Sequence, residues 1–218
     1  MKMTTGQKRK NKSTYLQKVL IKIRYGMVRQ VLRKQILRIG IEISPYYLFL
    51  EGIENSVIPA ITGLEPDFSA GILLTEDMGL MENNGSGFSP DDFLDFLKAG
   101  QKCIGIKCKG EIAAFMWINF SELKYKSLCI QLKSNEAYLW NMFTLEPYRG
   151  KNLAPYLRYK SYEMLHEMGR DTLYSISEYF NAPAIKFKKK LNARILKLAV
   201  YIKFFKKFER NFTLKSYV

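Results

Sequence analysis

The stretch PYRGKNLAPYL, residues 147–157, places two cationic side chains among small residues, directly after the apolar run YLWNMFTL. An apolar run followed by an amphipathic segment predicts a strand, a short loop and a helix that begins near Asn152. The first amides of such a helix have no intrahelical partner and lie at the positive end of the helix dipole. With Arg149 and Lys151 beside them, these amides form a candidate cradle for a diphosphate. Pro155 is compatible with the first turn, where its missing N–H costs no helical hydrogen bond.

This stretch resembles motif A of the GCN5-related N-acetyltransferases (GNAT), whose pattern is Arg or Gln, two residues, Gly, one residue, then Gly or Ala. In this chain the pattern is filled by Arg149, Gly150, Lys151, Asn152, Leu153 and Ala154. The arginine, Ala154 and the downstream Leu157 match, whereas Asn152 replaces the central glycine. Because asparagine adopts positive φ more readily than most residues, we expect the loop to keep its shape.

A second stretch, NAPAIKFKKKL, lies at the expected distance downstream and resembles the family segment N-x-x-A-x-x-x-Y-x-K-x-G-F. The positions that match are Asn181, Ala184, Ile185 and Lys189 or Lys190. The tyrosine that protonates the departing thiolate in many members would stand near Lys188, and Asn192 and Ala193 replace the usual GF. The run GEIAAFMWINF also resembles a family hairpin, so the likeness spans roughly residues 90–205. Two motifs in order are more specific than either alone.

The resemblance implies an α/β (α+β) fold: a mixed, mostly antiparallel sheet with helices on both faces and one splayed pair of parallel strands, Tyr138–Leu145 and Thr172–Phe180. It implies an N-acyltransferase whose co-substrate is acetyl-CoA or another acyl-CoA and whose acceptor is an amine or a hydroxyl. The cofactor-binding residues that it implies are Phe143, Thr144 and Leu145 for the pantetheine arm, residues 149–154 (Arg149, Gly150, Lys151, Asn152, Leu153, Ala154) for the diphosphate, and Asn181.

An acceptor amine must lose a proton before or during attack, so such a site needs a base or a chain of waters. Glu178 and Glu136 are the favoured carboxylates, and Glu146 is nearby in sequence. Because Lys188 replaces the family tyrosine, the acid that protonates the thiolate has to be sought elsewhere. Tyr179 and Tyr156 are the candidates for that role. Positioning alone can also supply much of the rate.

The elements that position these residues follow from hydrophobic periodicity. Residues 15–39 predict an amphipathic basic helix, and residues 89–100 predict a helix with Ser89 as N-cap and Gly100 as its stop. The run YYLFLEGI predicts a strand or a short buried segment. Four apolar runs, KCIGIKC, GEIAAFMWINF, SLCIQLK and EAYLWNMFTL, predict an antiparallel meander whose first turn is Lys109-Gly110. A helix from about Asn152 to Met168, the strand TLYSISEYF, a helix capped by Asn181, and a strand or helix at KLAVYIKFF complete the order.

Charge is distributed unevenly along the 218 residues. The formal net charge is +15, yet residues 1–40 hold 12 basic residues and no acid, and residues 186–218 hold 11 basic residues and one acid, Glu209. The middle of the chain is mildly acidic. Basic ends of this kind favour an anionic partner: lipid headgroups, nucleic acid or a phosphorylated carrier. No RNA-binding motif accompanies them, which argues against nucleic acid.

Three regions are therefore expected: a basic tail (1–13), a helical and irregular region (14–88), and an acyltransferase core (89–218). The absence of an apolar signal core predicts a cytoplasmic protein, peripheral at the inner face of the membrane if the basic ends bind lipid. Three scattered cysteines and a single histidine, His166, argue against a metal site. The competing hypothesis is a GNAT-like adaptor without catalysis that binds membrane or nucleic acid through its basic ends.

Overall fold

The computed structural model describes residues 40–52, 57–63, 68–79, 87–205 and 207–217, so the tail at 1–13 and the helix expected at 15–39 lie outside the described residues. The chain divides into two compact units. The first contains residues 1–44 and 201–210, and the second contains residues 45–200 and 211–218. Among the described residues no helix is both long and apolar enough to cross a membrane.

The sheet contains eight strands in the order β10-β9-β1-β8-β7-β4-β3-β2. Their bounds are β1 (Ile41–Glu51), β2 (Phe68–Leu73), β3 (Lys102–Cys108), β4 (Glu111–Asn119), β7 (Glu136–Thr144), β8 (Thr172–Glu178), β9 (Arg194–Phe204) and β10 (Phe208–Ser216). A separate hairpin pairs β5 (Glu122–Tyr125) with β6 (Leu128–Gln131). The helices are α3 (Thr75–Met78), α4 (Pro90–Lys98), α5 (Leu153–Glu167) and α6 (Ala182–Lys190), with a 3₁₀ turn, η2, at Glu146–Tyr148.

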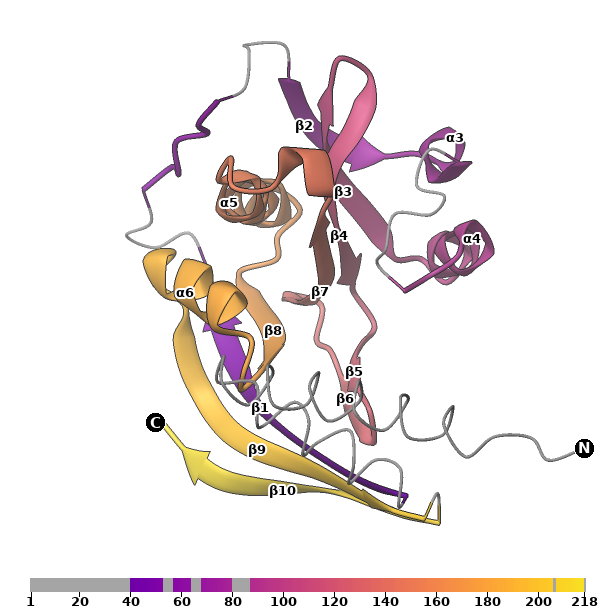
Figure 1. Cartoon of the computed structure of the whole chain (residues 1–218), viewed down its shortest axis with the longest axis vertical. Coiled ribbons are helices and arrows are strands. Elements are labelled where there is room, and N and C mark those ends of the chain that lie inside the picture. The colour runs from indigo at the N-terminus through magenta and orange to yellow at the C-terminus, as the bar shows by residue number, and fades with distance from the viewer. Residues whose placement is uncertain (1–39, 53–56, 64–67, 80–86, 206, 218) are drawn as a thin grey trace, which may run out of the picture. The chain divides into compact units, whose positions relative to one another are not determined.

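The pairing is antiparallel at β1–β8, β2–β3, β3–β4 and β4–β7, and parallel at β7–β8. In the second unit α5 and α6 lie on one face of the sheet, and α3 and α4 lie on the other (Figure 1). The expected fold class, a mostly antiparallel sheet with one parallel pair and helices on both faces, is confirmed. A parallel pair needs a crossover, and α5 is the crossover helix between β7 and β8.

One expected strand lies outside the main sheet. The run SLCIQLK does not join the main sheet, because β6 pairs only with β5 in the small hairpin. The meander is therefore β3-β4-β7, and the prediction of four consecutive strands in it was wrong. The hairpin is instead an insertion between β4 and β7. Its Leu123 packs against Leu48 and Tyr138 of the main sheet.

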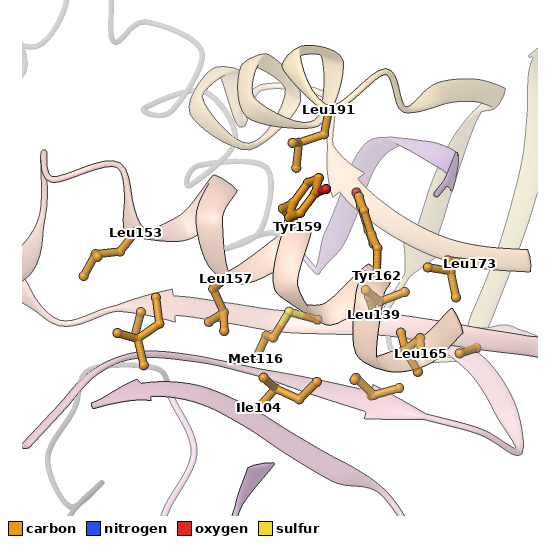
Figure 2. Packing of buried hydrophobic residues seen from close by; sticks show 14 of the residues in the cluster. Ile104, Met116, Leu139, Leu153, Leu157, Tyr159, Tyr162, Leu165, Leu173 and Leu191 are labelled. Carbon is orange, nitrogen blue, oxygen red and sulfur yellow. The ribbon is translucent and has the colours of Figure 1, made fainter. Parts of the chain in front are cut away.

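Two buried clusters cover the two faces of the central strands. On the α5 face, Leu153, Leu157 and Leu165 belong to one buried cluster with Ile104 and Met116 of β3 and β4 (Figure 2). On the opposite face, Phe93 of α4 packs with Phe115 and Trp117 of β4. Because both faces are covered, β4 is apolar at almost every position rather than at alternate ones.

The turns and caps follow local sequence. Lys109 and Gly110 both have positive φ, 52° and 84°, as a two-residue hairpin loop between β3 and β4 requires. Ser89 caps α4, because its Oγ accepts from the amide of Asp92 at 3.2 Å while Asp92 Oδ2 accepts from the amide of Ser89 at 2.8 Å. The run KLAVYIKFF forms strand rather than helix, because all of it except its last residue, Phe205, lies within β9.

The first strands also belong to the sheet. β1 pairs with β8, and β2 pairs with β3. The division expected at residues 88 and 89 therefore separates β1 and β2 from the strands they pair with. Cys103 and Cys108 are buried free thiols, whereas Cys129 is exposed.

A substitution at Gly105 tests the packing on the face of the sheet that α4 covers. Gly105→Ala is expected to lower the free energy of unfolding by about 1–3 kcal/mol, because a Cβ there would lie 2.6 Å from Cδ1 of the buried Leu73. Gly71→Ala is the matched control, since Gly71 pairs with Gly105 across β2 and β3 and its Cβ would meet nothing within 4 Å. Urea unfolding measures both variants, and an equal loss in the two contradicts the packing argument.

Candidate functional site

The loop between β7 and α5 has the backbone that motif A predicts. Gly150 has φ +79°, and Asn152, the N-cap of α5, has φ +64° and ψ +22°, in the left-handed region. The expectation that asparagine can replace the central glycine there is confirmed at the level of the backbone. A Cβ on Gly150 would meet nothing within 4 Å, so glycine is favoured there because of the positive φ and not because a side chain would clash.

The cationic side chains of the loop lie against its own frame. Arg149 Nε donates to the carbonyl of Thr144 at 3.1 Å, and its guanidinium lies 5.6 Å from the centre of the Phe143 ring. Lys151 Nζ lies 5.7 Å from the centre of the Tyr148 ring. These contacts hold both charges close to the end of β7 and the start of α5.

Residues 57–63 lie against the outer side of this loop. The amide of Thr62 donates to the carbonyl of Lys151 at 3.1 Å, and Asn152 Nδ2 donates to the carbonyl of Ala60 at 2.6 Å. The amides of Leu153 and Ala154 belong to the first turn of α5, where the helix itself supplies no acceptors. These two hydrogen bonds fix the loop on one side. The amides at the N-terminus of α5 remain available as donors suited to an anion.

The parallel strands separate before β7 reaches this loop. The pairs between β7 and β8 run from Glu136–Thr172 to Leu139–Ser175, and both strands continue past the last pair. We call the point beyond Leu139 and Ser175 the fork. On its other edge β7 stays paired with β4, and the amide of Leu145 donates to the carbonyl of Ala113 at 3.0 Å. Residues 140–144 thus lie past the last pair with β8, as the predicted pantetheine contacts Phe143 and Thr144 require.

A bulge in β7 coincides with the fork. The register between β4 and β7 shifts between Phe115 and Trp117, and Asn141 adopts φ +45°. Asn141 Nδ2 is buried and has no hydrogen-bond partner within the described part of the chain. The main chain of residues 140–144 lies past the last pair with β8, and such an open strand edge fits an extended, amide-containing ligand such as the pantetheine of CoA.

The predicted acid and base residues fall into two places. Glu178 is the last residue of β8, and its carbonyl accepts from the amide of Asn181, the N-cap of α6. Tyr179 follows, 38% exposed and stacked on Tyr47 with ring centres 5.3 Å apart. Both follow the fork along β8.

Glu136 begins β7, at the opposite end of that strand from the loop. Its carboxylate already accepts from the amide of Lys133 at 2.9 Å and from the hydroxyl of Tyr174 at 3.2 Å. The structure therefore groups Glu178, Tyr179 and Asn181 but separates Glu136 from them. The catalytic roles of all these side chains stay predictions.

Lys188 is buried at the fork. Only 2% of it is exposed, and its Nζ donates to Ser175 Oγ at 2.6 Å and to the carbonyl of Ile176 at 3.2 Å. Ser175 is the last residue of β8 that pairs with β7, and Ile176 is the next residue along the strand. The ammonium also lies 3.6 Å from Glu51 Oε1 and 4.8 Å from the centre of the Phe49 ring.

Glu51 is the centre of a buried ionic network. Its carboxylate accepts from the hydroxyls of Tyr162 and Ser175 and lies 3.5 Å from Arg158 Nε. Burial alone would raise the pKa of Glu51, but the charges of Arg158 and Lys188 and the two hydroxyl donors hold that pKa below its usual value. One carboxylate thus faces two cations, and the elements β1, β8, α5 and α6 meet around it.

Of this network, only Lys188 was singled out from the sequence. The available signals were Glu51 inside the apolar run YYLFLEGI and Arg158 next to Leu157 on the buried side of a helix. Neither signal identifies a partner, because the pairs are separated by up to 137 positions in sequence.

A cavity of about 820 Å³ opens near the C-terminal end of α5. It is lined by Glu51 and Tyr162 of the network, by His166, and by the cationic side chains Arg170 and Arg194. His166 lies 13 residues along α5 from Leu153, roughly 20 Å at 1.5 Å per residue, so this cavity is not at the loop. Among the described residues no group of three or more His, Cys, Asp or Glu side chains could hold a metal ion.

Comparisons with known proteins agree with this geometry. The model of the acetyltransferase (GNAT) family matches residues 73–193, more than half of the chain. No curated protein matched. The fold is similar to solved structures described as a putative GNAT-family acetyltransferase from Novosphingobium aromaticivorans (TM-score 0.51, 18% identity, 75% of this chain and 66% of that one) and a GNAT-family acetyltransferase from Colwellia psychrerythraea (TM-score 0.56, 14% identity, 77% and 59%). This chain therefore spans about three-fifths to two-thirds of the length of these structures.

The buried amine predicts a pH dependence of stability. Burial lowers the pKa of Lys188 from 10.5 to about 7, against the opposing effect of Glu51. The folded state therefore binds fewer protons than the unfolded state between those pH values, and this residue's contribution to stability rises with pH across that window. Lys188→Met is expected to remove the rise in urea-unfolding free energy between about pH 7 and pH 10. Lys189→Met, at the exposed neighbour, is expected to keep it. If both variants follow the wild-type curve, Lys188 does not titrate as a buried amine.

Proposed function

Because the chain belongs to the acetyltransferase (GNAT) family, we propose that it transfers an acyl group, acetyl in the simplest case, from CoA to an amine or, less often, a hydroxyl. The observation that carries the proposal is the fork between β7 and β8 beside a helix N-terminus flanked by Arg149 and Lys151. An open strand edge and a set of amides for a diphosphate are the two features that an acyl-CoA requires. Here β7 provides the open edge past Leu139, and the helix that follows along the chain, α5, provides the amides.

The substrate would run from the loop into the fork. Its diphosphate would be held by the amides of the first turn of α5 and by Arg149 and Lys151. The amides of its pantetheine arm would pair with the main chain of Phe143–Leu145, whose other edge is paired with β4. In this extended arrangement the thioester would point along β7 toward the fork, behind which Ser175 and Lys188 are buried.

In the reaction the acceptor nitrogen attacks the thioester carbonyl carbon, the C–S bond breaks, and the thiolate leaves with the electron pair. Glu178 is the favoured acceptor of the proton that the nitrogen loses, because the carboxylate of Glu136 is held at the other end of β7. Tyr179 is the candidate donor to the thiolate. The ammonium of Lys188 adds positive potential at the fork, where the negative charge develops.

Acetyl-CoA is expected to raise the melting temperature of the wild-type chain. A ligand at a hundred times its Kd stabilises the native state by about 2.7 kcal/mol, which corresponds to a shift of roughly 5 °C or more in a chain of this size. Arg149→Glu is expected to abolish most of this shift. Lys98→Glu, the same charge change on the exposed face of α4, should retain it. The measurement is differential scanning fluorimetry, followed by thiol release from acetyl-CoA with a panel of amines.

The absence of a shift with acetyl-CoA and with longer acyl-CoAs would contradict the enzyme and favour the adaptor without catalysis. A shift without thiol release for any amine leaves binding intact and moves the search to hydroxyl acceptors.

We further propose that the protein works on the cytoplasmic face of an anionic membrane, docked through its basic ends. The support is the charge distribution, with 12 basic residues and no acid in residues 1–40. Such segments bind anionic leaflets by about 1 kcal/mol per Lys or Arg near the surface. An acceptor on a lipid-linked precursor would suit this location.

The full-length chain is expected to sediment with vesicles that contain anionic lipid and not with neutral vesicles. Replacement of the Lys and Arg residues among positions 1–38 by glutamine should reduce the bound fraction at least tenfold, because the electrostatic attraction is lost. Sedimentation at low and high salt measures this dependence. Equal binding to neutral and anionic vesicles contradicts the docking.

A further inference from the structure

The turn between β9 and β10 gathers apolar side chains that its own unit leaves exposed. In the first unit, Phe204, Phe205 and Phe208 are 38%, 65% and 46% exposed, and Ile43 of β1 is 43% exposed. Phe204 and Phe208 lie close together, with ring centres 6.3 Å apart. Four large apolar side chains in so small a unit exceed the scattered exposure that is ordinary on a protein surface.

Phe205 occupies a backbone position that disfavours it. Its φ is +48°, in the left-handed region, where a bulky residue is an outlier and glycine or asparagine would be accommodated with less strain. The ring is nevertheless the most exposed of the three, so its burial does not offset that strain. A strained and exposed aromatic side chain indicates a use outside the fold.

Positively charged side chains lie at the same turn. The amide of Phe205 donates to the carbonyl of Gly40 at 2.7 Å, which ties the turn to the start of β1. Lys207 and Arg210 are exposed on the turn, and Arg210 lies 5.8 Å from the centre of the Phe208 ring.

The acid nearest to these groups along β10 is already paired. Glu209 accepts from the hydroxyl of Tyr201 at 2.7 Å and lies 3.5 Å from Lys203 Nζ. The Tyr201 hydroxyl, with Lys203, keeps the pKa of Glu209 below its usual value. The carboxylate therefore does little to repel an anionic surface.

We propose that the β9–β10 turn inserts Phe204, Phe205 and Phe208 into the interface of an anionic bilayer, while Lys207 and Arg210 bind the headgroups. This inference rests on the membrane docking proposed above and names the element that enters the lipid. Phenylalanine side chains bury well at the boundary between headgroups and acyl chains, and Arg and Lys remain at headgroup level. Stable anchoring takes two signals, and the turn supplies an apolar one through its phenylalanines and a cationic one through Lys207 and Arg210.

The decisive experiment places a reporter in the turn of the full-length chain. Phe205→Trp is titrated with vesicles of phosphatidylcholine and phosphatidylglycerol, with and without brominated acyl chains. Leu214→Trp is the matched control. Leu214 is 60% exposed and belongs to β10, as Phe208 does, but lies six residues beyond Phe208. After subtraction of the wild-type signal from Trp117 and Trp140, at least twofold quenching is expected at position 205 and none at position 214.

A second variant separates insertion from folding. Phe205→Asn suits positive φ, so the melting temperature is expected to stay the same or rise. Its partition onto anionic vesicles is expected to fall about fivefold or more, since the apolar area that enters the lipid is lost. A large fall in melting temperature would show that the ring serves the fold, and the proposal would be overturned.

The outcomes distinguish this inference from the docking on which it rests. Sedimentation with anionic vesicles and no quenching at position 205 would keep the docking and overturn insertion by the turn. No sedimentation would overturn both, and leaves the acyl-CoA site untouched. Signal change at position 205 with duplex RNA and not with vesicles would assign the turn to a nucleic acid instead.

Discussion

The buried carboxylate of Glu51 is the interaction on which the arrangement around the fork depends. It ends β1 and accepts from Tyr162 of α5 and Ser175 of β8, with Arg158 and Lys188 at 3.5 and 3.6 Å. Moving charges out of water has a large desolvation free energy. Ion pairing offsets it only where the geometry is good and hydrogen bonds satisfy the remaining polar atoms. Four elements that are distant in sequence are thereby held by one group, and none can shift without leaving a buried charge exposed to an apolar environment.

The network affects the candidate site because the two helices that it joins, α5 and α6, begin there. α5 starts at the loop of Gly150 and Asn152, and α6 starts at Asn181. A helix is stiff, so the place where Arg158 or Lys188 is fixed also fixes the first turn of its helix. Productive geometry in acyl transfer tolerates little displacement, and residues that never touch a substrate can set it. Lys188 contributes in both ways, because it anchors α6 and brings its ammonium to the fork.

The fork itself follows from what each strand can pair with. β7 turns its backbone at Asn141, and past Leu139 its free edge no longer follows β8. β4 on the other edge keeps the strand extended to Thr144. An open edge inside a sheet is usually a liability, because unpaired backbone groups seek partners. Here the open edge lies next to a helix N-terminus, so the same chain segment offers strand pairing and an anion site to one elongated ligand.

Residues close in sequence determined the local features of this protein. The loop at 149–154, the cap at Asn181, the helix after Ser89 and the turn at Lys109-Gly110 were all predictable, because each depends on dihedral preferences and hydrogen bonds within a few residues. The alternation of apolar residues likewise determined most strands, and two motifs in order determined the family. The sequence alone could not place SLCIQLK, since β6 has the composition of a sheet strand and only its neighbours decide that it pairs with β5.

Only the tertiary structure decided where the ionisable groups act. It joined Glu51, Arg158 and Lys188 across three elements, set Glu136 apart from Glu178, and left Phe205 exposed in a strained turn. The physical reason is that charge pairing and burial depend on distance in space, which the chain spacing of these residues does not encode.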